Sequence, residues 1–380
     1  DCMKTIDIKR DSSALVLLYP IANILFSTLT GAEHYSTFTI MYVFAILLTC
    51  IWRNHCRVDV NFIIIGSVFL ITMSVAYNKS GSILLQFFSF LLLLDAYHYK
   101  DYEETFKKNI LESDKLIFRG ICFYLAVLFY TVVFKDGIQT GWGTVVLYGP
   151  YSLSHILAYE LLAILCLALF VYKIKMETKW LVLGAVLEVL IVLTCVRSAI
   201  LSSAFVLIWL LHSFNLKRKF EYILLGGIVL GILAYFRVFD QVITKSLYAM
   251  GNGSITNGRE WIVNSVSMIY EESSVFEKVF GSGYENLLRG NYRYLGTAIQ
   301  GHNDLLTILI SFGIVGVGLY TEELIRFIKG KGGIGCFLML AVLVYYNGLF
   351  LYTSMVIGLI VVRIFFRECG STRKKNNNEI

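Results

Sequence analysis

The sequence has 380 residues, of which 57% are hydrophobic and 16% are charged, with a formal net charge of +6 and a mean hydropathy of +0.68. So apolar a composition excludes folding as a water-soluble domain. Apolar runs of roughly 17 to 22 residues recur along nearly the whole chain, and each is long enough to cross about 30 Å of hydrocarbon as a helix. The sequence therefore predicts an all-α fold, a polytopic transmembrane helical bundle.

Breaking the apolar runs at charge clusters predicts about twelve spans. Their limits lie near 14–30, 36–52, 60–77, 80–97, 117–134, 152–172, 180–195, 198–214, 220–236, 303–320, 333–347 and 350–366. The last two spans are the least separated, because only Asn347-Gly348 and Tyr352-Thr353-Ser354 break the stretch 334–366. The chain thus divides into spans one to nine (1–236), a long loop (237–302), spans ten to twelve (303–366) and a tail (367–380).

Charge in the connecting segments predicts the orientation. Most of the 33 Lys and Arg residues fall in loops on one side, and positively charged loops stay cytoplasmic. Both termini are therefore expected in the cytoplasm, and 237–302 on the outer face. Residues 98–117 mix charges at helical spacing, which indicates a solvated helix at the cytoplasmic interface.

The long loop is polar yet rich in aromatic residues, and an ordered loop of this length is usually functional. Within it, Asn257 can cap a helix whose third residue, Glu260, completes a capping-box-like pair. The apolar residues that follow share one helical face: Ile262, Val266 and Ile269. This pattern predicts an amphipathic helix that lies on the membrane surface.

Three spans that run inward begin beside polar residues, at Ser152-Leu153-Ser154-His155, Arg197-Ser198 and His302-Asn303-Asp304. A helix N-terminus carries unpaired N–H groups and about half a positive charge, so it attracts phosphate. If the three starts converge, they form an anion site with Arg197 and an arginine from the loop. The alternative for Arg197 is a snorkelling side chain at a span end.

His302 can exchange protons near neutral pH and is a plausible general base; the alternative is an interfacial or capping histidine. Glu160 and Glu188 lie within spans, where a carboxylate either is protonated and structural or lines a substrate path. The eight cysteines lack metal spacing, and no Walker loop, Asp-x-Asp pair or His-Glu-x-x-His is present. Chemistry driven by ATP, a nucleotide-sugar or zinc is therefore disfavoured, and no cofactor or metal is expected.

Five segments taken together resemble the pattern of bacterial O-antigen ligases and Wzy-type polysaccharide polymerases. They are Thr194-Cys195-Val196-Arg197-Ser198-Ala199, Asn257-Gly258-Arg259, Gly281-Ser282-Gly283-Tyr284, Gly301-His302-Asn303-Asp304-Leu305-Leu306 and Gly313-Ile314-Val315-Gly316. The resemblance covers about 180 to 330, and the first half of the chain is similar only in topology.

The resemblance implies a glycosyltransferase of polysaccharide biosynthesis, for O-antigen of lipopolysaccharide or for capsule, in the bacterial inner (plasma) membrane. A polymerase of this kind transfers a growing glycan from undecaprenyl diphosphate to a hydroxyl of a lipid-linked repeat unit. By position in the motifs, the functional arginines fall on Arg197 and Arg259, and the functional histidine on His302. Further substrate-binding candidates are Arg289, Arg293, His155, Glu188, Asn303 and Tyr284. The expected partners are the lipid-linked oligosaccharide, the bilayer and a chain-length regulator protein, with no nucleic acid.

Two alternatives remain at this point. An O-antigen ligase would move the finished glycan to lipid A core, and the sequence separates it poorly from a polymerase. A flippase or other transporter also has about twelve spans, but it typically shows two related halves and short outer loops. Here the single large outer loop lies in the second half, which favours the enzyme.

Overall fold

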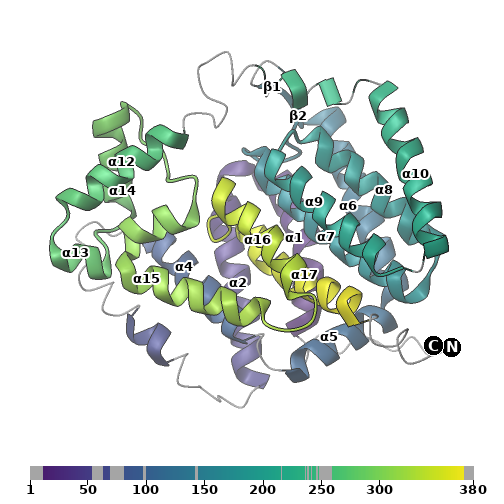
Figure 1. Ribbon diagram of the computed structural model, residues 1–380, viewed down its shortest axis with the longest axis horizontal. Coiled ribbons are helices and arrows are strands. Elements are labelled where there is room, and N and C mark those ends of the chain that lie inside the picture. The colour runs from purple at the N-terminus through teal and green to yellow at the C-terminus, as the bar shows by residue number, and fades with distance from the viewer. Residues whose placement is uncertain are drawn as a thin grey trace.

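The computed structural model describes residues 12–53, 63–68, 81–96, 100–141, 144–214, 216–235 and 259–371, with isolated positions between 237 and 247. Within these ranges the fold is all-α apart from one short antiparallel hairpin (Figure 1). The helices of the first half are α1 (Ser12–Thr30), η1 (Ala32–His34), α2 (Tyr35–Arg53), α4 (Gly81–Ala96), α5 (Lys100–Glu112), α6 (Asp114–Phe134) and α7 (Ser154–Lys175). Those of the second half are α8 (Thr178–Leu193), α9 (Arg197–His212), α10 (Leu216–Tyr235), α12 (Arg259–Glu272), α13 (Val275–Phe280), α14 (Tyr284–Leu295), α15 (Asp304–Ile328), α16 (Gly333–Tyr346) and α17 (Thr353–Ser371). Strands β1 (Ile138–Gly141) and β2 (Thr144–Leu147) join α6 to α7 with Ile138 opposite Leu147.

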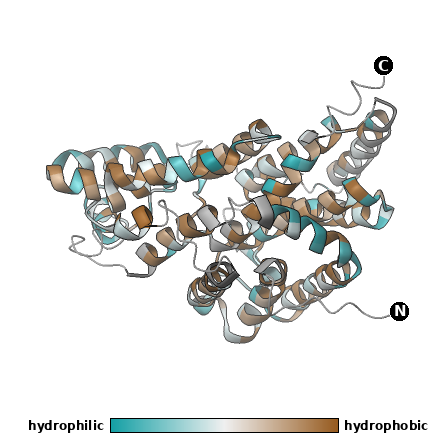
Figure 2. Ribbon diagram, turned by 90° about the horizontal axis from the view of Figure 1, so that it is seen from below, coloured by the Kyte–Doolittle hydropathy of each residue, from teal (hydrophilic) through white to brown (hydrophobic). Residues whose placement is uncertain are grey.

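Most helices coincide with the predicted spans to within a few residues, but α15 continues to Ile328, past the predicted end at 320, and α17 continues to Ser371, past 366. Of the span predicted at 60–77, only the helical residues 63–68 are described. Among the described residues, α6, α7 and α15 are long and apolar enough to cross a membrane, and several shorter helices are apolar as well. Figure 2 shows hydrophobic segments, in brown, recurring along the helices with paler and teal segments between them. The all-α fold is confirmed in the described parts of the chain, and the division into about twelve membrane spans stays a prediction.

Helix α7 is the centre of the bundle. Nearly all of its side chains are buried, against α8 and α9 on one side and α17 on the other (Figure 1). A helix that is apolar nearly all round, as α7 is from Ile156 to Tyr172 apart from Glu160, is buried on every side. The start of α7 therefore lies deep among its neighbours rather than at the edge of the bundle.

The predicted charged helix at 98–117 is α5. It buries Phe106 and Ile110, and two of its charged residues, Glu103 and Lys107, contact the last turns of α17. Lys107 Nζ lies 3.3 Å from Glu368 Oε2, and Arg367 pairs with Glu103. Helix α5 thus packs across the end of the bundle where α17 finishes, opposite the end where α17 starts.

The long loop folds back into helices α12, α13 and α14, which form a layer beside α15 (Figure 1). Residues Ile262, Val266 and Ile269 share one buried face of α12, as predicted. That face packs against Leu287 of α14 and Ile310 of α15. The partner of the predicted apolar face is therefore protein, and the position of α12 at a membrane surface stays a prediction. The predicted cap Asn257 lies outside the described residues.

A contact between two glycines attaches this layer to α15. Gly313 interrupts α15 with φ 67° and ψ −169°, and Gly281 ends α13 with φ 87°. A Cβ at Gly313 would overlap the carbonyl of Val279, so the two backbones meet with no room for a side chain. The N–H of Ser282 donates to the Ile310 carbonyl at 2.8 Å, since the interruption leaves that oxygen accessible. Two of the segments that carry the family resemblance therefore meet at this glycine contact.

Candidate functional site

The turn between α8 and α9 places Arg197 at a helix start. Cys195 takes a left-handed conformation with φ 52°, and the Val196 N–H donates to Thr194 Oγ1 at 3.4 Å. The N-cap position of α9 is Val196, whose apolar side chain makes no cap. The first turn of α9, which begins with Arg197 and Ser198, therefore keeps the anion-binding character of a helix N-terminus.

The turn before α15 positions His302. Its φ of 47° is left-handed, a conformation that histidine adopts more readily than most residues. The next residue, Asn303, caps α15: its Oδ1 accepts from the N–H groups of Leu305 at 2.9 Å and Leu306 at 3.3 Å. Asn303 satisfies these two N–H donors at the start of α15. The contribution of this region to the site is therefore the His302 side chain, from the turn before α15.

The starts of α7, α9 and α15 meet around one polar cavity of about 200 Å³. Its lining residues are His155, Cys195, Val196, Arg197, Ser198, Arg259, Ile299, His302, Tyr346 and Asn347. The structure thus brings together four of the predicted site residues, from α7, α9, α12 and the turn before α15. The three helix starts thus lie at one cavity, which was the condition for the predicted anion site. None of the described lining residues is Asp or Glu.

Two cations and a neutral histidine set the charge of this cavity. Burial lowers the pKa of Arg259, and the neighbouring charge of Arg197 lowers it further. The guanidinium of Arg259 donates from Nη2 to Asn347 Oδ1 at 3.1 Å and lies 5.2 Å from the Tyr346 ring centre.

Burial, and then Arg259, lowers the pKa of His302 from 6.5 to about 4. Its Nδ1 is buried and has no hydrogen-bond partner among the described residues. At neutral pH the imidazole is therefore uncharged and able to accept a proton. With two guanidinium groups and no carboxylate among its described lining residues, the cavity suits an anion with two charges.

Comparison with known proteins adds no family assignment. No protein-family model, curated protein or solved structure matches the chain. The resemblance to O-antigen ligases and Wzy-type polymerases therefore remains a prediction. Independently of it, the structure brings Arg197, Arg259 and His302 from three of the five segments to one cavity.

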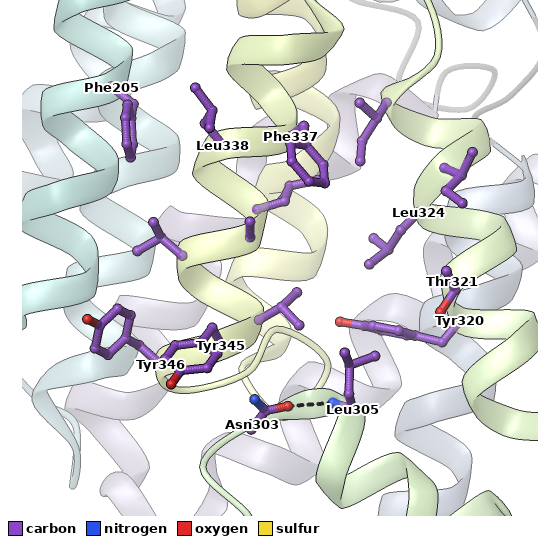
Figure 3. A pocket seen from close by; sticks show the side chains of 16 residues that line it. Phe205, Asn303, Leu305, Tyr320, Thr321, Leu324, Phe337, Leu338, Tyr345 and Tyr346 are labelled. Atoms are coloured by element: carbon purple, nitrogen blue, oxygen red, sulfur yellow. Dashed lines mark hydrogen bonds between the residues drawn. The ribbon is translucent and has the colours of Figure 1, made fainter. Parts of the chain in front are cut away.

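An apolar groove of about 590 Å³ adjoins the polar cavity. It runs between α15 and α16, and Phe205 of α9 closes one side (Figure 3). Tyr346 lines both the groove and the polar cavity, and the predicted residue Asn303 lies at this same end of the groove. Figure 3 shows Phe337 and Leu324 further along the two helices. The groove therefore leads from the charged cavity into the apolar body of the helices.

Three predicted residues of the long loop lie outside the polar cavity. Arg289 pairs with Glu285 at 3.5 Å and Arg293 with Glu272 at 3.0 Å, and both arginines line a second pocket of about 280 Å³ between α12, α13 and α14. Tyr284 Oη lies 3.4 Å from Gln300 Oε1. The Arg293 pair joins α14 to α12, the Arg289 pair lies within α14, and Tyr284 joins α14 to the turn before α15.

The two carboxylates within predicted spans also lie outside the cavity. Glu188 Oε1 accepts from Ser203 Oγ at 2.8 Å, which joins α8 to α9. Glu160 is fully buried between α1, α6 and α7 and has three donors. These donors are Tyr124 Oη at 2.9 Å, Tyr151 Oη at 2.6 Å and Asn23 Nδ2. A carboxylate with three donors is a structural element of the bundle.

Sequence reasoning missed Asn347 and Tyr346. Both residues precede Gly348, in the break between the last two predicted spans. The sequence pattern indicates only a connection there. A polar pair inside the apolar stretch 334–366 was the available signal. Its meaning depends on which helices surround it, and here Tyr159 of α7 and Ser198 of α9 both receive hydrogen bonds from Asn347.

Proposed function

We propose that this chain is a bacterial inner-membrane polysaccharide polymerase. It transfers a growing glycan from undecaprenyl diphosphate to the hydroxyl of a lipid-linked repeat unit. The observation that carries the proposal is the polar cavity, in which two arginines and a neutral histidine adjoin an apolar groove. An amphiphilic donor with a diphosphate between a sugar and a long hydrocarbon chain matches both parts. In this proposal the chain has about twelve spans, both termini are cytoplasmic, and the cavity faces outward.

The diphosphate binds Arg197 and Arg259, whose forked guanidinium groups match phosphate oxygens. The uncapped first turn of α9 adds N–H donors and the positive end of the helix dipole. As the glycosidic bond breaks, negative charge grows on the leaving diphosphate, so these contacts strengthen in the transition state. A preorganised donor of this kind lowers the activation barrier by roughly 3 kcal/mol.

His302 receives the proton of the acceptor. The acceptor hydroxyl oxygen attacks the anomeric carbon, and the bond from that carbon to the diphosphate oxygen breaks with its electron pair on the lipid diphosphate. The hydroxyl proton moves to the neutral imidazole. The bound diphosphate raises the proton affinity of His302, because an anion favours the imidazolium.

The apolar groove aligns the isoprenoid chain of the donor. Its continuous lining on α15 runs from Tyr320 to Ile328, about 12 Å along the helix at 1.5 Å per residue, and Leu305 lies beside Tyr320 because α15 is interrupted at Gly313 (Figure 3). In a bilayer the chain exchanges lipid contacts for protein contacts, so the groove adds little affinity. It instead fixes the direction in which the diphosphate enters the cavity past Tyr346.

Incubation of the purified protein with lipid-linked repeat units tests this proposal. We expect Arg197→Ala and His302→Ala to lower the rate of chain extension by at least about 100-fold. Arg119→Ala, at an exposed position of α6, is the matched arginine control and keeps the wild-type product ladder. Near-normal ladders from both site variants would refute the proposal.

A gel of cell-surface glycan from cells without the gene separates polymerase from ligase. Single-repeat products mean that the protein is a polymerase. Full-length chains stranded on the lipid carrier mean that the same cavity serves a ligase, which replaces the lipid-linked acceptor by lipid A core.

A further inference from the structure

One side chain, Asn347, joins the long loop to two helices of the bundle at the polar cavity. Its Oδ1 accepts from Arg259 Nη2 at 3.1 Å. Its Nδ2 donates to Ser198 Oγ at 2.7 Å and to Tyr159 Oη at 3.0 Å. The residue is only 4% exposed, and its own N–H donates to the Leu343 carbonyl at the end of α16. Both ends of the amide are therefore fixed by partners from separate elements.

The acceptor for Arg259 is neutral, and this matters because the usual partner of a buried guanidinium is a carboxylate. A carboxylate at this place would form an ion pair with Arg259 and cancel its charge. The described lining of the cavity holds no Asp or Glu that does so. An amide oxygen orients the guanidinium through one of its five N–H donors and leaves its positive charge available to a bound anion.

We propose that Asn347 is a positioning residue that holds Arg259 for a diphosphate without neutralising it. The identity of the anion as the donor's diphosphate rests on the proposed function. The positioning itself rests on the three hydrogen bonds. Tyr346, the residue before Asn347, contacts the same guanidinium with its ring face. Two neighbouring residues at the end of α16 therefore fix the position and the orientation of the Arg259 guanidinium.

The substitution Asn347→Asp separates charge from shape. Aspartate has the size of asparagine and keeps an oxygen for Arg259. The hydroxyls of Ser198 and Tyr159, which now accept from Nδ2, can each turn to donate to the new carboxylate, in place of the 3.0 Å hydrogen bond that joins the two hydroxyls. The contacts of residue 347 with its three partners are therefore retained, and the change that reaches the cavity is one negative charge beside Arg259.

Binding of farnesyl diphosphate to the purified full-length protein in neutral detergent tests this role, with farnesol as the uncharged probe. We expect Asn347→Asp to weaken farnesyl diphosphate binding by about 30-fold, as Arg259→Ala does, and to leave farnesol binding and the melting temperature unchanged. Adding Asn347→Asp to Arg259→Ala should cause little further loss, because the two changes remove one interaction. Asn109→Asp, on α5 at the opposite end of the bundle, adds the same charge and should bind both probes like the wild type.

Wild-type affinity of Asn347→Asp for farnesyl diphosphate would overturn the proposal, and so would an equal loss of farnesol binding. A wild-type protein that does not bind farnesyl diphosphate overturns it as well. A wild-type protein that binds the diphosphate through Arg259 and Asn347 but does not extend repeat units refutes the transfer function alone. The two proposals therefore fail separately.

Discussion

Replacing Gly313 by alanine should release the long loop from α15. The backbone at Gly313 (φ 67°, ψ −169°) lies in a region that is open essentially only to glycine, and another residue there costs about 1–3 kcal/mol. The new Cβ would also overlap the carbonyl of Val279, which adds roughly 1–3 kcal/mol of overpacking. The sum, about 4 kcal/mol, corresponds to a nearly 1,000-fold increase in the population of the detached loop.

Hydrogen exchange of the Ser282 amide measures this detachment directly, because its N–H donates to the Ile310 carbonyl across the glycine contact. Gly313→Ala should speed exchange by about 1,000-fold if the amide exchanges through loop detachment. Gly281→Ala should act similarly, and the double variant should exceed either single change only slightly, since both disrupt one contact. Gly318→Ala is the matched control in α15, because a Cβ there meets nothing within 4 Å. Wild-type exchange at Ser282 in Gly313→Ala would refute the reasoning.

Three further predictions concern titratable groups. Because the pKa of His302 is lowered to about 4 in the folded protein, the acid limb of the kcat/KM profile should lie near pH 4. The acid limb of kcat should lie at higher pH, since bound diphosphate favours the imidazolium. Initial rates between pH 4 and 8 check this, and acid limbs that both lie at pH 6.5 contradict it. The same shift lowers stability as pH falls from 6.5 to 4, because the unfolded state takes up the proton first. Glu160→Gln should lower the free energy of unfolding by about 1–3 kcal/mol, because the amide NH₂ of glutamine would then face a hydroxyl that now donates to Glu160. Turnover per folded molecule should not change. Loss of turnover at an unchanged melting temperature would show that Glu160 has a role beyond structure.

The sequence predicted the helices well because their positions depend on local information. An apolar run of sufficient length forms a helix wherever the charges at its ends allow, and the described helices follow this rule within a few residues. The amphipathic face of α12 was also predictable from spacing. Its partner was not, because Ile262 has the same periodicity whether it meets lipid or Leu287 of α14.

The core of the candidate site was predictable for a different reason. Alternating spans place the starts of α7, α9 and α15 at the same end of the bundle, so His155, Arg197 and His302 had to share that end. Their meeting in one cavity required the packing of α7 against α9, which no spacing records. Asn347 and the groove beside α16 escaped prediction because each is made by helices far apart in the chain.

The glycine contact and the Arg259–Asn347 hydrogen bond are linked through the long loop. Arg259 begins α12, whose buried face packs on α14 and on Ile310, the residue whose carbonyl receives the Ser282 N–H. A loop that detaches at the glycines therefore loses the surface that supports α12, and with it the position of Arg259. The neutral amide of Asn347 cannot hold the guanidinium alone, since one hydrogen bond contributes only about 1–3 kcal/mol. The charge of the polar cavity thus depends on two attachments, one beside the arginine and one at Gly281 and Gly313 on the far side of the loop helices. Under the proposed function, an acceptor glycan that binds this loop would consequently act on the binding of the donor diphosphate through the position of Arg259.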